Sequence, residues 1–235
     1  MNPLTNCKNI YFIGIGGIGM SALARYFNTQ GVVVSGYDKT PTLLTDALVE
    51  EGIQIHFEDD LAKIDKEATV IVYTPAIPNE HGELNYYRDN KYLVVKRSDV
   101  LQWITENAFT IAIAGTHGKT TTTSMTAHIL RHTGYGCNAF LGGIATNYGT
   151  NFWSHEKNVV VVEADEYDRS FLKLAPNIAV ITAVDPDHLD IYGTAEEVVK
   201  AFGEFSDKIK PGGVLIQKWG NAFNTNTSNK TVLSY

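Results

Sequence analysis

The residues with the clearest capacity for chemistry form a glycine- and threonine-rich stretch, GTHGKTT, at residues 115–121. It directly follows a run of alanines and β-branched residues, so a strand is expected to end in a tight loop that opens a helix. Such a loop presents backbone N–H groups and a helix dipole to phosphate oxygens. Lys119 can neutralise phosphate charge, and the Thr120 hydroxyl can bind Mg²⁺. The loop is shorter than the usual G-x-x-x-x-G-K-[ST] pattern, because Ile113 stands where that pattern has its first glycine. We predict an ATP-type site made of Gly115, Thr116, His117, Gly118, Lys119, Thr120 and Thr121.

Two acidic clusters follow this loop, each directly after an apolar run. Glu163, Asp165 and Glu166 come after four valines, and Asp187 and His188 come after the next apolar run. The carboxyl ends of parallel strands meet at one edge of a sheet, where ligands bind. Carboxylate oxygens are the ligands that Mg²⁺ prefers. We therefore predict a metal- and phosphate-binding edge, with an acidic strand end facing solvent as the alternative.

A second glycine-rich loop, GIGGIG at residues 14–19, lies between an expected strand and an expected helix. Asp38 follows at the end of the next strand, which completes the dinucleotide-binding pattern. An NAD-linked oxidoreductase is one interpretation, but the diphosphate of a nucleotide sugar fits the same geometry. A dehydrogenase needs no second phosphate loop with Lys and Thr. The pair of loops favours an enzyme that uses ATP on a substrate held by its diphosphate.

The wider pattern alternates short apolar runs with amphipathic segments, as in α/β domains with parallel sheets. The series restarts once, which predicts a Rossmann-like domain over residues 1–107 and a P-loop-type α/β domain over residues 108–235. Predicted strands cover 9–15, 32–36, 53–57, 69–73, 92–95, 110–114, 159–163, 178–183 and 213–217. Predicted helices cover 21–29, 43–51, 84–89, 100–106, 120–133 and 195–209. We expect residues 221–230, rich in Asn and Thr, to form a surface loop.

The composition is that of a globular protein, since 44% of the residues are hydrophobic. The net charge is −7 and no Lys/Arg block occurs, which argues against a nucleic-acid-binding surface. No leader and no membrane-spanning apolar run is visible, so we expect a soluble, cytoplasmic protein without membrane contact. Cys7 and Cys137 lack metal-binding spacing and indicate reduced thiols. The sequence carries no indication of oligomeric state.

In combination, three motifs resemble the ATP-binding signatures of the Mur ligases: GTHGKTT at 115–121, EADE at 163–166 and DHLD at 187–190. Three more resemble the branch of that family that adds L-alanine: GIGGIGM at 14–20, SGYD at 35–38 and YTPAIP at 73–78. The resemblance extends from about residue 10 to residue 214. Members of the family have three domains, so it implies an N-terminal domain and an incomplete central domain, inactive alone.

The resemblance implies an ATP-dependent ligase of peptidoglycan precursor synthesis. It would phosphorylate the lactyl carboxylate of UDP-N-acetylmuramate and pass the acyl phosphate to the amine of L-alanine. Two alternatives stay open beside the oxidoreductase. One is the recycling relative that attaches a ready-made tripeptide, and the other is a nucleotide-binding regulator without catalysis.

The resemblance also implies roles for individual residues. Lys119, Glu163 and His188 would be catalytic, with Thr120 and Glu163 on one Mg²⁺ and His188 on a second. Several relatives carry a carbamylated lysine after the DHxD segment, but Lys200 is out of register for that role. The UDP diphosphate would lie on the first loop, with Asp38 near the nucleoside. The loop residues concerned are Gly14, Gly16, Gly17, Ile18, Gly19 and Met20.

Overall fold

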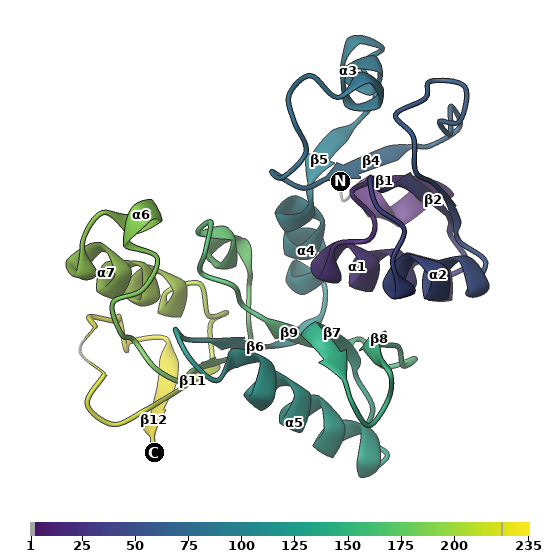
Figure 1. Cartoon of the computed structure of the whole chain (residues 1–235). Coiled ribbons are helices and arrows are strands. Elements are labelled where there is room, and N and C mark those ends of the chain that lie inside the picture. The colour runs from purple at the N-terminus through teal and green to yellow at the C-terminus, as the bar shows by residue number, and fades with distance from the viewer. Residues whose placement is uncertain (1–2, 222) are drawn as a thin grey trace. The chain divides into compact units, whose positions relative to one another are not determined.

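The computed structural model describes residues 3–221 and 223–235, which form two compact units (Figure 1). The first unit is Met1–Trp103 and the second is Ile104–Tyr235. This division falls inside helix α4 (Arg97–Glu106), whereas the sequence-based boundary lies just after that helix, between residues 107 and 108. Within the described residues, no helix is both long and apolar enough to cross a bilayer.

The first unit is a five-stranded parallel sheet in the order β3-β2-β1-β4-β5. These are the first five positions of the Rossmann strand order, in which the order of the strands reverses between β1 and β4 and leaves a crevice for ligands there. Its strands are β1 (Asn9–Ile13), β2 (Val33–Tyr37), β3 (Gln54–His56), β4 (Val70–Tyr73) and β5 (Val94–Lys96). Its helices are η1 (Pro3–Asn6), α1 (Ile18–Thr29), α2 (Leu43–Glu50), α3 (Gly82–Asp89) and α4.

The central strands of this sheet are apolar without alternation, since both faces of the sheet are covered. Tyr11 and Ile13 of β1 and Ile71 of β4 are fully buried and contact Leu84 and Tyr87 of α3 in one core cluster. Parallel sheets with helices on both faces produce this continuous apolar pattern.

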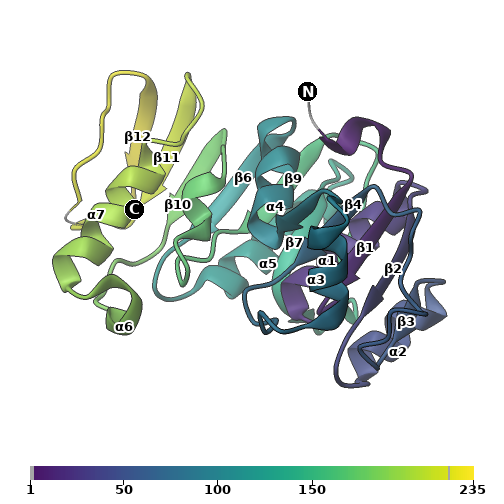
Figure 2. The ribbon, with the colours of Figure 1, turned by 90° about the horizontal axis from the view of Figure 1, so that it is seen from above.

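The second unit is a seven-stranded sheet in the order β12-β11-β10-β6-β9-β7-β8. All neighbouring strands are parallel except β7 and β8, which form an antiparallel hairpin. Figure 2 shows β12, β11, β10, β6 and β9 side by side across this unit, and α5 packs against β6, β7 and β9. The strands are β6 (Phe109–Ala114), β7 (Asn138–Ala145), β8 (Thr150–Trp153), β9 (Val159–Glu163), β10 (Ile178–Ile181), β11 (Gly213–Gln217) and β12 (Lys230–Ser234). The helices are α5 (Lys119–His132), η2 (Ser170–Lys173), α6 (Leu189–Tyr192) and α7 (Ala195–Ser206).

The predicted parallel α/β organisation is confirmed, and every predicted strand and helix overlaps an observed one. The pattern missed β7, β8, α6 and β12. In β7 the apolar run is interrupted by Gly142 and Gly143, and glycines weaken the strand signal while marking bulges. Of the predicted loop at 221–230, residue 222 lies outside the described residues, and Lys230 already belongs to β12.

Candidate active site

The GTHGKTT loop joins the end of β6 to the start of α5 in the second unit. Gly115 has φ +134°, and a Cβ there would lie 2.1 Å from Oγ1 of Thr182, so only glycine fits. Gly118 has φ +80° and precedes the first residue of α5. Thr182 follows β10 and donates its hydroxyl to the carbonyls of Ala114 and His117. The strand next to β6 therefore fixes the conformation of the loop.

Lys119 lies in this loop paired with a buried carboxylate. Its Nζ donates to Oε1 of Glu166 at 2.7 Å and to the Gly115 carbonyl at 2.8 Å. Glu166 is fully buried, and its Oε2 has no hydrogen-bond partner within the part of the chain that the structure describes. The sequence places Glu166, the last residue of the EADE motif, at the predicted metal- and phosphate-binding edge but assigns it no role of its own. A fully buried acid next to a phosphate-loop lysine can balance the lysine charge.

Thr120 and Glu163 place a hydroxyl and a carboxylate side by side. The Thr120 hydroxyl donates to Oε1 of Glu163 at 2.9 Å, and the Gly142 N–H donates to Oε2 at 3.0 Å. Burial raises the pKa of Glu163, and the hydrogen bonds from Thr120 and Gly142 oppose that shift. A hydroxyl and a carboxylate at the mouth of a phosphate loop fit Mg²⁺, which uses few protein ligands together with substrate phosphates. The described residues contain no cluster of three or more His, Cys, Asp or Glu side chains that could hold a metal ion.

His188 lies beside the same buried carboxylate, at the start of α6. Its Nε2 is 3.8 Å from Oε1 of Glu166 and 3.7 Å from Oδ2 of Asp187. Its ring meets the Tyr167 ring edge-on at 5.1 Å. The structure therefore places His188 close to Glu166, the partner of Lys119. Among the described interactions, none joins His188 to Glu163.

The other predicted loop residues have different surroundings. The Thr116 hydroxyl accepts a hydrogen bond from the Asp185 N–H at 3.1 Å, so it braces the loop against the segment after β10. The His117 side chain is 71% exposed, and its Nε2 lies 4.0 Å from Oδ2 of Asp185. Lys200 is also exposed and pairs with Glu197 on its own helix, as expected for a lysine outside the site.

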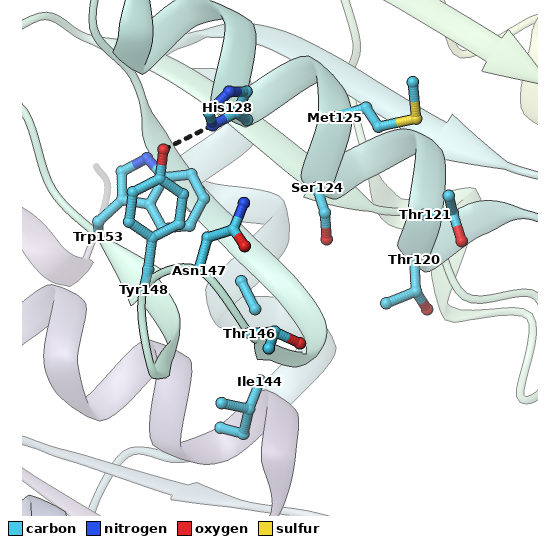
Figure 3. A pocket seen from close by; sticks show the side chains of 11 residues that line it. Thr120, Thr121, Ser124, Met125, His128, Ile144, Thr146, Asn147, Tyr148 and Trp153 are labelled. Carbon is cyan, nitrogen blue, oxygen red and sulfur yellow. Dashed lines mark hydrogen bonds between the residues drawn. The ribbon is translucent and has the colours of Figure 1, made fainter.

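A cavity of about 370 Å³ begins at Thr120 and runs between α5 and the β7–β8 hairpin (Figure 3). Nδ1 of His128 and the Tyr148 hydroxyl share a hydrogen bond of 2.6 Å at its far end. The cavity thus adjoins the Thr120–Glu163 pair. Its lining is Thr120, Thr121, Ser124, Met125, His128, Ile144, Ala145, Thr146, Asn147, Tyr148 and Trp153.

In the first unit, the GIGGIG loop is held by the end of β2. The Gly14 and Ile15 N–H groups donate to the Tyr37 carbonyl at 2.8 and 3.0 Å. The Gly16 N–H donates to Oδ2 of Asp38 at 2.7 Å, and Oδ1 of Asp38 accepts from the Thr40 N–H at 3.1 Å. Asp38 was expected near a nucleoside, and the structure gives its carboxylate a second task as a brace of the loop.

The glycines of this loop differ in what they require. A Cβ on Gly16 would lie 2.9 Å from Oδ2 of Asp38, and one on Gly19 would lie 2.8 Å from Nη1 of Arg97. A Cβ on Gly17 would meet only ordinary contacts. The sequence pattern missed Arg97, which comes from α4 and brings a guanidinium against the loop. Two further predicted residues open α1: Ile18 is partly exposed, whereas the Met20 side chain is buried.

A buried acid, Glu83, lies close to Tyr37 at the end of β2. The Tyr37 ring contacts His56, and Nε2 of His56 lies 3.5 Å from Oε1 of Glu83. Tyr11 donates its hydroxyl to Oε2 of Glu83 at 2.6 Å, and the Asp60 N–H donates to Oε1 at 3.1 Å. Burial raises the pKa of Glu83 to about 7, against these two hydrogen bonds. The end of β2, directly before Asp38, thus borders a buried acid with a pKa of about 7.

Comparison with known proteins covers both units. Residues 9–108 match the model of the Mur ligase family catalytic domain, and residues 113–235 match that of the Mur ligase middle domain. The UDP-N-acetylmuramate–L-alanine ligase of Porphyromonas gingivalis is 53% identical over 92% of this chain and 49% of its own length. The same-named enzyme of Cytophaga hutchinsonii is 52% identical over 92% of this chain and 48% of its own length. The chain spans about half the length of the curated relatives it matches.

Solved structures resemble the same chain. The UDP-N-acetylmuramate–alanine ligase of Thermotoga maritima has a TM-score of 0.80 at 30% identity, over 90% of this chain and 49% of that chain. The UDP-N-acetylmuramate:L-alanyl-gamma-D-glutamyl-meso-diaminopimelate ligase of Neisseria meningitides has a TM-score of 0.83 at 25% identity, over 97% and 78%.

Proposed function

The chain belongs to the Mur ligase family, and from that premise we propose that it carries the ATP site and the UDP-sugar site of a ligase that joins L-alanine to UDP-N-acetylmuramate. The observation that carries the proposal is the convergence of Lys119, Thr120 and Glu163 at the end of β6 and β9. The 53% identity to an L-alanine ligase supports L-alanine as the amine substrate, over the tripeptide that the recycling branch attaches. Family membership removes the oxidoreductase alternative.

In the proposed reaction, an oxygen of the lactyl carboxylate attacks the γ-phosphorus of ATP and ADP leaves. The amine of L-alanine then attacks the acyl phosphate, losing a proton, and inorganic phosphate leaves. Both first reactants are anionic, so stabilisation of negative charge is the main demand on the site. Bound Mg²⁺, held by Thr120 and Glu163, would supply part of the positive charge that this stabilisation needs.

Lys119 would supply the rest. In the structure its ammonium group is held by Glu166 and by the Gly115 carbonyl. We propose that it exchanges these partners for phosphate oxygens when ATP binds. His188 lies within 3.8 Å of the same Glu166 oxygen, and we keep it as the residue nearest the acyl phosphate and a ligand of a second ion.

For the UDP-sugar, we propose that the diphosphate lies on the loop from Gly14 to Met20 with the Arg97 guanidinium as its counter-ion. The Arg97–Gly19 contact supports this assignment. Asp38 would act by holding the Gly16 N–H in place, in addition to its expected place near the nucleoside. The substrates are small molecules, and we propose that the reaction takes place in the cytoplasm.

Two measurements test the proposal. Calorimetric titration of the 235-residue chain should show separate binding of Mg²⁺·ATP and of UDP-N-acetylmuramate, and no binding of NADH. Phosphate release by the enzyme that contains this chain should require UDP-N-acetylmuramate and L-alanine. Release with the tripeptide but not with L-alanine would reassign the chain to the recycling branch. Tight NADH binding would overturn the ligase proposal.

A further inference from the structure

Strand β7 leaves its regular pairing where it passes the metal-binding carboxylate. Its parallel register with β9 runs to the pair Phe140–Val162, and its antiparallel register with β8 shifts between Phe140 and Ala145. Gly142 lies inside that irregular stretch. Its N–H donates to Oε2 of Glu163 at 3.0 Å, so it bonds a side chain instead of the backbone of a neighbouring strand. Bulges next to active sites commonly redirect groups in this way.

Gly142 also leaves the space that this carboxylate occupies. A Cβ at residue 142 would lie 2.4 Å from Oε2, 2.7 Å from Cδ and 2.8 Å from Oε1 of Glu163. All three contacts are to the far end of one flexible side chain, so a methyl group would displace the carboxylate without disturbing the backbone. The φ of Gly142 is not positive, so backbone strain does not add to the effect.

The neighbouring glycine provides a contrast. A Cβ at Gly143 would meet only Cγ2 of Thr120, at an ordinary 3.6 Å, and its φ is not positive either. Of these two adjacent glycines of one strand, Gly142 is therefore the one at which a side chain would strike Glu163.

Resting on the proposed function, we propose that Gly142 is a positioning residue for Mg²⁺·ATP. Its N–H and its missing side chain together fix the Glu163 carboxylate against the Thr120 hydroxyl, so that both oxygen ligands face the phosphate loop. The distance of 2.9 Å between Thr120 Oγ1 and Glu163 Oε1 depends on this placement. Displacing the carboxylate would leave Lys119 and the loop backbone intact and would remove only the metal-dependent part of nucleotide binding.

The test compares Gly142→Ala with Gly143→Ala in the 235-residue chain. ATP binding is titrated at a series of Mg²⁺ concentrations and again in EDTA, and the thermal midpoint is recorded. For Gly142→Ala we expect the Mg²⁺ concentration at half-saturation to rise by about tenfold or more, as for lost outer-shell partners of other metal sites. Affinity in EDTA and the thermal midpoint should match those of the unmodified chain. Gly143→Ala should stay within about twofold of the unmodified chain in every measurement.

A double variant isolates the cause. Glu163→Asp shortens the acid and withdraws it from residue 142, so adding Gly142→Ala to it should cost little more than Glu163→Asp alone. If Gly142→Ala fails to fold but the double variant folds, the steric conflict with Glu163 is established. If neither folds, the glycine serves the fold and the inference is wrong.

The remaining outcomes are distinct. Equal effects of Gly142→Ala and Gly143→Ala, or a loss of ATP affinity that is the same in EDTA, overturn the positioning role alone. An unmodified chain that binds no Mg²⁺·ATP overturns both this role and the proposed function.

Discussion

The two glycine-rich loops follow equivalent strands and open equivalent helices, yet their charges are arranged in opposite ways. In the first unit a carboxylate, Asp38, accepts a backbone N–H of the loop, and the cation, Arg97, comes from a distant helix. In the second unit the cation, Lys119, belongs to the loop, and carboxylates from the end of β9 hold its ammonium group and the next hydroxyl. The backbone scaffold is shared, and the placement of the carboxylates gives each loop its own ligand chemistry.

The largest expected effect separates the two loops. In the enzyme that contains this chain, Lys119→Ala should lower ATP-dependent acyl phosphate formation by about a thousandfold, because the site loses its own cation for the transferred phosphate. Binding of UDP-N-acetylmuramate, measured by calorimetry, should stay unchanged. Lys200→Ala, at an exposed lysine of the same unit, is the control and should have no effect. Near-normal turnover of Lys119→Ala would contradict the assignment of residues 115–121 as a phosphate-binding loop.

The next effect concerns the buried anion beneath Lys119. Glu166→Gln keeps the shape and leaves the lysine charge without its 2.7 Å partner, so unfolding free energy should fall by about 2–4 kcal/mol. Glu197→Gln removes an exposed acid that pairs with Arg169 at 3.4 Å, and should cost less than about 1 kcal/mol. Urea unfolding measures both. Equal losses would mean that Glu166 is no stronger a partner than a surface acid.

A smaller effect tests the cation of the first loop. Arg97→Ala should weaken UDP-N-acetylmuramate by about tenfold while ATP affinity stays constant, because one charge-assisted contact is lost. Arg88→Ala, which removes a guanidinium lying over the Tyr73 ring, is the control in the same unit. A fall in ATP affinity instead would show that the two loops do not divide the ligands as proposed.

A final effect is a pH dependence confined to the first unit. Glu83 has a pKa of about 7 when folded, above its ordinary 4.5, so the folded state binds the extra proton. Its contribution to stability is therefore complete below about pH 4.5 and is lost as the pH rises through 7. The unfolding free energy of the unmodified chain minus that of Glu83→Gln should fall over that range, because the glutamine does not titrate. Glu80→Gln, at an exposed acid nearby, should show a constant difference, and the same constancy for Glu83→Gln would refute the assignment.

The sequence alone was sufficient to predict features whose residues lie close together in the chain. Each glycine loop is such a feature, and so are Lys119 and Thr120 within the second loop and Glu163 at the end of a run of valines. Arg97 and Gly142 were missed because each meets its partner only through the fold, across α4 and across a bulge. Asp38 was found by its spacing, but its contact with the Gly16 N–H depends on how β2 lies beside β1.

The pairing of Lys119 with Glu166 also bears on how nucleotides leave. Since the lysine already has an anion at 2.7 Å, ATP binding as proposed would be an exchange of counter-ions, and its affinity would reflect the difference between two ion pairs. At the end of the proposed reaction, Glu166 would compete with the phosphates of ADP for the lysine. Such an internal competitor would limit the retention of product, so the contact that orders the empty site would favour turnover over tight binding.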